Sequence, residues 1–119
     1  MSSPTLSQKL TAEAIGTAIL VFIGAGSVPL TVFLTAGAGH TGIDGTAGLS
    51  TISFAFAFAI FAAVYSIGHI SGCHINPAIT ISLLATRKID SRTAGAYIAA
   101  QLVGAFPRRG VDTDHPDRE

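Results

Sequence analysis

The apolar residues of this chain fall into long runs that are broken at only a few points. Residues 10–34 contain one charged residue, Glu13, and residues 45–86 contain no Asp, Glu, Lys or Arg. A helix needs about 20 apolar residues to cross the ~30 Å hydrocarbon core of a bilayer. The pattern therefore predicts one membrane-spanning helix over about 10–34 and a second over about 49–67, joined by a Gly-rich loop.

Each of the two runs has an alternative interpretation. The first resembles a secretory signal peptide with Lys9 as its basic region, but the run is long for that purpose and contains Glu13. The second includes the alternating stretch FAFAFAIF, which is typical of a strand. Its length and the absence of turn residues favour a helix.

The segment after the second run is apolar but interrupted. Residues 70–86 form either a third full span or a loop that enters the membrane to mid-depth and returns as a half-helix over about 77–86. Asn76 is a good N-cap and Pro77 suits the first helical position, so a helix is expected to begin here. A full span would not start a helix in its own middle. Irregular backbone at membrane depth persists only where it is buried in protein or lines a watery cavity, so the half-helix is favoured.

The charges are unevenly distributed, although the formal net charge is zero. No basic cluster indicates a nucleic-acid partner. Arg87, Lys88 and Arg92 follow the half-helix, whereas the Gly-rich loop has neither Lys nor Arg. The excess of basic residues on the cytoplasmic side of membrane proteins then places the N-terminus and residues 87–92 in the cytoplasm. The single cysteine, Cys73, excludes an internal disulfide.

The last apolar segment is short. Residues 93–107 are free of charge and would span about 22 Å as a helix, which is less than the bilayer core. We expect a partial span over about 92–106. Residues 107–119 carry half of all the charges in the chain. Because the apolar pattern stops so abruptly there, we expect this tail to result from a shifted reading frame.

The stretch SGCHINPAIT (residues 71–80) resembles the S-G-x-H-x-N-P-A-[VI]-T signature of the aquaporin and glycerol-facilitator family, the major intrinsic proteins. Residues 12–27, 53–72 and 96–105 resemble that family's first three helices, so the resemblance covers about residues 5–106. It implies an all-α membrane protein comprising the N-terminal half of an aquaporin-like fold, with two full transmembrane helices, a re-entrant loop with a half-helix, and a truncated third helix. In the family two such halves bring two N-P-A tips together. This chain has one N-P-A and lacks the family's selectivity-filter arginine.

The implied function is passive flux of water or small uncharged solutes such as glycerol. The resemblance further implies a multi-pass protein of the cell (inner) membrane, surrounded by the lipid bilayer, with no enzymatic activity and no cofactor. It implies a homotetramer for full-length members. Because one half encloses only part of a pore wall, we expect this chain not to conduct alone. Two alternatives remain: a non-functional truncated fragment, and a secondary transporter with a discontinuous helix, which would need an ion site.

The resemblance also assigns roles to single residues. Asn76 caps the half-helix and donates to passing water, and Pro77 and Ala78 complete its tip. The carbonyls of the preceding loop form a ladder of acceptors; its residues are Gly72, Cys73, His74 and Ile75. Glu13 accepts hydrogen bonds from that loop.

Pore-wall roles fall on three further residues. Phe56 occupies the aromatic-constriction position, Ile60 lies lower on the wall, and Leu20 lines the lumen. Simpler interpretations are a plain N-cap for Asn76, a surface position for Glu13, and lipid contact for Phe56 and Ile60.

Two chemical alternatives are disfavoured. His69, Cys73 and His74 are too crowded for a tetrahedral metal site, and no fourth ligand is evident. Ser71 lies between two histidines, but the G-x-S-x-G turn of serine hydrolases is absent.

Overall fold

The computed structural model describes residues 3–37 and 45–106, and every regular element among them is a helix, which confirms the all-α prediction. The first helical segment consists of α1 (Leu6–Ile19), a π-helical stretch η1 (Leu20–Ala25) and α2 (Gly26–Gly37). It is followed by α3 (Gly45–Ser71), the short α4 (Pro77–Ala85) and α5 (Ser91–Ala105). The stretches Leu6–Ala36 and Ala47–Ser71 are long and apolar enough to cross a membrane.

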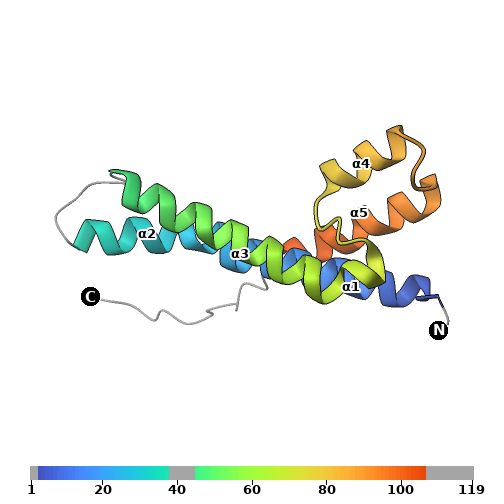
Figure 1. Cartoon of the computed structure of the whole chain (residues 1–119), viewed down its shortest axis with the longest axis horizontal. Helices are drawn as coiled ribbons and strands as arrows, with labels where there is room; N and C mark the ends of the chain where they lie inside the picture. The colour runs from blue at the N-terminus through green and yellow to red at the C-terminus, as the bar shows by residue number, and fades with distance from the viewer. Residues whose placement is uncertain (1–2, 38–44, 107–119) are drawn as a thin grey trace, which may run out of the picture.

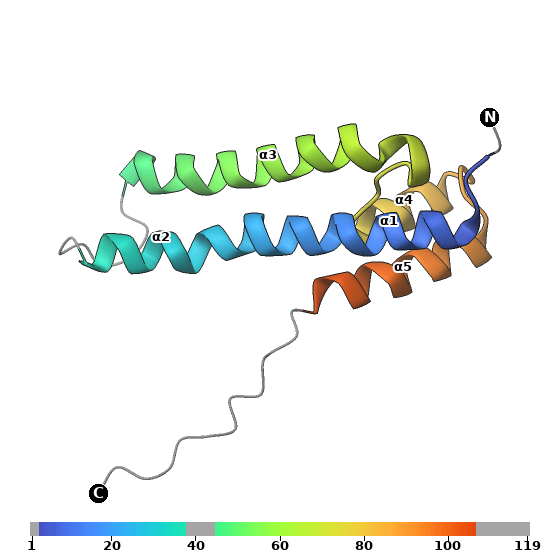
Figure 2. The same ribbon diagram turned by 90° about the horizontal axis from the view of Figure 1, so that it is seen from below.

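The first segment and α3 lie side by side along the length of the molecule, and α5 lies on the other side of α1 (Figure 2). Small residues allow this close approach. Ala59 and Ala63 are buried on α3, and Ala12 is buried on α1. At Gly104 of α5 a Cβ would collide with the backbone carbonyl of Ala14, so the backbones of α5 and α1 touch there.

The π-helical stretch is not predicted by the apolar pattern. It ends at Ala25, four residues before Pro29, which lies inside α2. Pro29 lacks the N–H that would bond the backbone carbonyl of Ala25, and its ring crowds that carbonyl. The wider π turn in the helical turn that precedes Pro29 is a way to relieve that conflict, because it rearranges the local hydrogen bonding without breaking the helix.

The predicted end of the second long helix also differs from the structure. Helix α3 continues to Ser71, beyond the expected end near residue 67. It stops where Gly72 takes a φ of 87°, the left-handed conformation that commonly ends helices. The expected Gly-rich loop lies partly in residues 38–44, and the charged tail lies in residues 107–119; both stretches are outside the described residues.

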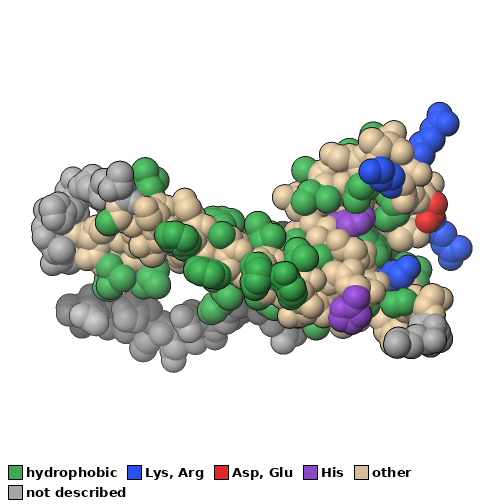
Figure 3. All heavy atoms as spheres, viewed as in Figure 1, with side chains coloured by type: hydrophobic (Ala, Val, Ile, Leu, Met, Phe, Trp, Pro, Cys, Tyr) green, Lys and Arg blue, Asp and Glu red, His purple; other side chains and the backbone are tan. Residues whose placement is uncertain are grey.

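Large apolar side chains cover the outside of the long helices (Figure 3). Phe22, Phe33 and Tyr65 are among the most exposed, at 82%, 75% and 75%. Apolar surface on this scale is unfavourable in water. On helices of spanning length it suits contact with lipid.

Candidate functional site

The chain reverses direction between α3 and α4. Helix α3 runs toward the end of the molecule that holds the N-terminus; residues 72–76 turn back inward, and α4 then runs outward again beside α5 (Figure 1). Helix α4 has nine residues, which corresponds to about 14 Å. Because α4 runs outward, its N-terminus lies nearer the middle of the molecule's long axis than its C-terminus does (Figure 1).

Asn76 caps this N-terminus. Its side-chain oxygen accepts a 2.8 Å hydrogen bond from the backbone N–H of Ala78, and Pro77 occupies the first turn. The Asn76 side chain is exposed, and no described residue accepts a hydrogen bond from its amide N–H₂. An amide donor thus remains free at the positive end of the α4 dipole.

The loop before Asn76 has a strained backbone. Gly72, Cys73 and Ile75 have φ values of 87°, 51° and 43°. Glycine adopts the left-handed region freely, but each of the other two residues costs of the order of 1–3 kcal/mol there, and a β-branched isoleucine is a clear outlier. Something outside the loop must hold it in this shape.

That support is the carboxylate of Glu13, which is completely buried. Its Oε1 accepts from the Ser71 hydroxyl at 2.7 Å and from the backbone N–H of His74 at 2.9 Å. Its Oε2 accepts from the backbone N–H of Ile75 at 2.6 Å and from the Gln101 side chain at 2.7 Å. Four donors fill the acceptor sites of the carboxylate, which makes a buried charge tolerable without a cation.

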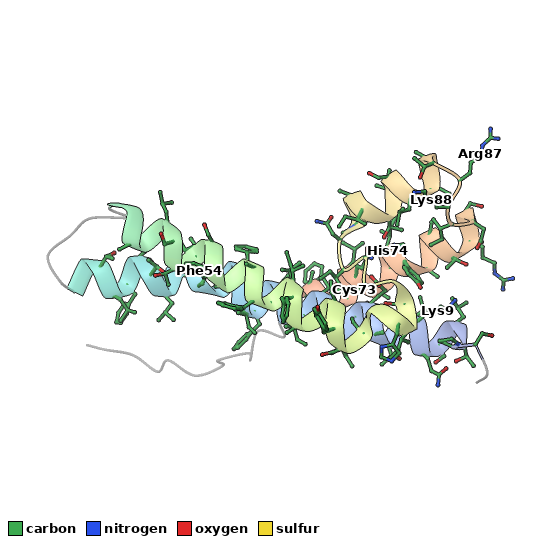
Figure 4. The ribbon with its side chains drawn as sticks, in the orientation of Figure 1. Lys9, Phe54, Cys73, His74, Arg87 and Lys88 are labelled. Atoms are coloured by element: carbon green, nitrogen blue, oxygen red, sulfur yellow. The ribbon has the colours of Figure 1, made fainter. Side chains whose placement is uncertain are left out.

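A second group of polar side chains joins α4 and α5 to this carboxylate. Gln101 Nε2 also reaches Thr80 Oγ1 at 3.0 Å, and Thr80 Oγ1 lies 3.1 Å from His74 Nδ1. Tyr97 donates to the carbonyl of Ser71 at 2.9 Å, and its ring lies edge-on to His74. Figure 4 shows Cys73 and His74 in the loop at the junction of the helices. The loop is thus fixed from three helices at once.

Sequence reasoning missed Thr80, Tyr97 and Gln101 as parts of this cluster. A usable signal was present, because Tyr97 and Gln101 lie four residues apart in an apolar helix and so share one face. Polar side chains in a membrane helix usually face the interior of the bundle. Gln101 Oε1 is the one buried side-chain oxygen or nitrogen in the described part of the chain that has no hydrogen-bond partner.

The three residues predicted to line the pore wall lie outside the cluster of polar groups that surrounds the Glu13 carboxylate. Leu20 is half-buried at the start of η1, and Ile60 is 44% exposed on α3. Phe56 is half-buried, with its ring against Gly24 of η1. Within residues 3–37 and 45–106, no three side chains of His, Cys, Asp or Glu are grouped as metal ligands.

Basic side chains gather at the end of the molecule where α1 begins and α4 meets α5. Lys9, Arg87 and Lys88 all lie at this end (Figure 4). Asp90 in the same region caps α5 and accepts from the backbone N–H and the hydroxyl of Thr93 at 3.0 and 2.6 Å. These hydrogen bonds, that from the hydroxyl first, lower the pKa of the Asp90 carboxyl.

The chain is similar to known proteins over most of its length. The family model described as Major intrinsic protein matches residues 1–111. Aquaporin AqpM of Methanothermobacter marburgensis is 46% identical over 109 residues, which cover 85% of this chain and 44% of that protein. The probable aquaporin AqpM of Archaeoglobus fulgidus is 44% identical with the same coverage, and aquaporin Z of Rhodopseudomonas palustris is 41% identical over 84% of this chain and 38% of that protein. The chain thus spans less than half the length of these relatives.

Proposed function

The chain belongs to the major intrinsic protein family, as the signature in residues 71–80 predicts, and from this premise we propose that it forms one half of the wall of a passive channel. The permeant is water or a small uncharged solute such as glycerol. The relatives named above are aquaporins, which supports this class of solute.

The observation that carries the proposal is the exposed tip of α4. Asn76 presents a free amide N–H₂ beside the N-terminal end of a helix whose preceding loop is locked by Glu13. A water oxygen that accepts from this amide turns its own hydrogens away, and the positive helix end disfavours cations. Such a tip passes neutral molecules and opposes charged ones.

The other roles follow from the same proposal. Carbonyls of residues 72–75 serve as acceptors for the moving solute, and Glu13 supports their loop. Phe56 narrows the path, while Leu20 and Ile60 line it. The protein sits in the cell membrane with its N-terminus and residues 87–92 in the cytoplasm, assembles as a tetramer when paired with a second half, and catalyses no reaction.

We further propose that the chain as printed does not conduct alone. It contains one Asn-Pro-Ala sequence, and the described helices supply a single half-helix tip. A continuous pathway needs wall on all sides, because an open side would admit lipid.

Proteoliposomes test both statements. The 119-residue chain is reconstituted alone, and also after co-expression with the part of the Methanothermobacter marburgensis relative that the chain does not match; we call the second assembly the complemented channel. We expect water permeability equal to that of empty liposomes for the first. For the second we expect raised permeability with weak temperature dependence. Water flux from the chain alone contradicts the proposal that it does not conduct alone. A co-purified assembly without flux contradicts the proposal that the chain forms half of a channel wall.

A further inference from the structure

The π-helical stretch η1 meets α3 at one unusually close contact. Gly24 is buried, and a Cβ built on it would lie 2.6 Å from Cδ1 and 2.7 Å from Cε1 of the Phe56 ring. Ordinary van der Waals contact begins at 3.4 Å. A residue larger than glycine would therefore displace the ring by about 0.4 Å to reach the 3.0 Å limit of real contacts, and by about 0.8 Å to reach ordinary contact.

The direction of that displacement follows from the contact with Gly24. Phe56 is half-buried, and the side of its ring that faces η1 is covered by Gly24. The backbone of η1 cannot easily retreat, because it continues into α2 and α1 without a break. The Phe56 ring is the end of a side chain and is therefore the movable partner, so it moves away from η1.

We propose that Gly24 is a specificity-determining residue, which sets the width of the solute pathway by letting the Phe56 ring lie back against η1. The inference rests on the proposed function, in which Phe56 narrows the path. Gly24 touches no solute; it acts through the position of the ring. Glycine at this position widens the constriction, and alanine narrows it.

The functional test uses the complemented channel. In Gly24→Ala the ratio of glycerol to water permeability falls roughly tenfold, the smallest discrimination that one methyl group commonly gives in a pocket. In a Phe56→Ala background, where the ring is gone, the same substitution leaves the ratio unchanged. Gly26→Ala is the matched control, since its Cβ would meet only the Val21 carbonyl at 4.0 Å.

A structural test uses the 119-residue chain alone in lipid nanodiscs, with 4-fluorophenylalanine incorporated at position 56. The fluorine resonance shifts in Gly24→Ala and stays in place in Gly26→Ala. If Gly24→Ala does not fold, recovery of folding in Gly24→Ala/Phe56→Ala supports the contact, and failure to recover overturns it.

The two tests separate the possible failures. An unshifted resonance in folded Gly24→Ala overturns the inference whatever the flux shows. A shifted resonance with an unchanged permeability ratio overturns the role of Gly24 in specificity but leaves the channel intact. A wild-type complemented channel without flux defeats the proposed function and the pathway claim together, whereas the resonance still decides whether Gly24 positions the ring.

Discussion

The Oε2 atom of Glu13 lies 2.6 Å from the backbone nitrogen of Ile75, although 62 residues separate the two along the chain. Neither partner is favourable by itself. A buried carboxylate without donors is costly, and so is an isoleucine at a φ of 43°. The two costs offset each other. The left-handed turn aims the N–H groups of His74 and Ile75 at the carboxylate, and these hydrogen bonds hold the turn in place.

Glu13→Gln tests this mutual support. The amide keeps the size of the side chain but offers one acceptor oxygen, and its N–H₂ faces donors. We expect the free energy of unfolding to fall by roughly 2–5 kcal/mol, because charge-assisted hydrogen bonds are lost and buried donors are left unpaired. Equilibrium unfolding in mixed detergent measures it.

Thr17→Val is the control for this variant, since it removes a buried hydroxyl one turn away that bonds only to the backbone carbonyl of Glu13. We expect a change within about 1 kcal/mol. Equal losses in the two variants would show that the carboxylate has no special part in holding the loop.

Gly16→Ala tests the fit between α1 and the loop. A Cβ on Gly16 would lie 2.5 Å from Cγ2 of Ile75 and 2.6 Å from Cδ1 of Ile67. Overpacking of this kind costs about 1–3 kcal/mol, and we expect the Ile75 turn to be displaced. Gly95→Ala, whose Cβ meets nothing within 4 Å, should be neutral or stabilising in the same unfolding measurement. Similar free energies of unfolding for the two variants would contradict the close packing of α1 against the loop at Gly16.

The sequence predicted the helices where one local signal decided the outcome. Long apolar runs, the first with Glu13 as its one charge, indicated the two long helical segments, and Asn76-Pro77 indicated the start of α4. The π-helical stretch was missed because it depends on how the helix accommodates Pro29, which the apolar pattern does not express. The end of α3 was missed because the left-handed backbone of Gly72 ends the helix, and the apolar pattern does not express that conformation.

The candidate site was predictable only in part for a similar reason. The resemblance pointed to Glu13 and to the loop. It did not show that Gln101 and Thr80 would reach the same carboxylate network. That meeting depends on how closely α5 packs on α1, and the contact of Gly104 with the Ala14 carbonyl sets this distance. Such a packing distance is a tertiary property, which one helix does not encode by itself.

Asp90 should give the stability a small acid dependence. Its pKa is lowered in the folded chain from an ordinary value of 3.8, so its contribution is fully present above that value and is lost as the pH falls through the lowered pKa. Asp90→Asn keeps a capping oxygen but cannot titrate. Unfolding midpoints over about pH 2.5–7 should therefore show a smaller acid loss in the variant. Identical pH profiles would mean that the ionisation of Asp90 does not contribute to the stability.

Cys73 is predicted to line the pathway, because it lies in the loop whose carbonyls are proposed to face the solute. Its side chain is half-buried, and it is the only cysteine in the chain. A mercurial reagent should reduce the water permeability of the complemented channel, and a reducing thiol should restore it. Cys73→Ser should remove the block while leaving flux in place. Unchanged flux after complete labelling of Cys73 would place this thiol away from the pathway.

Asn76 allows its capping and pore roles to be separated. Asn76→Asp keeps an oxygen for the N–H of Ala78 and puts negative charge at a helix N-terminus, which is worth about 0.3–1 kcal/mol in favour of folding. It loses the free amide N–H₂. We therefore expect a stable chain whose complemented channel passes less water and excludes cations less well. Asn76→Ala loses the cap as well, and should lower the free energy of unfolding by about 1 kcal/mol. If Asn76→Asp transports as the wild type does, the amide is only a cap, and the proposed function loses the observation that carries it.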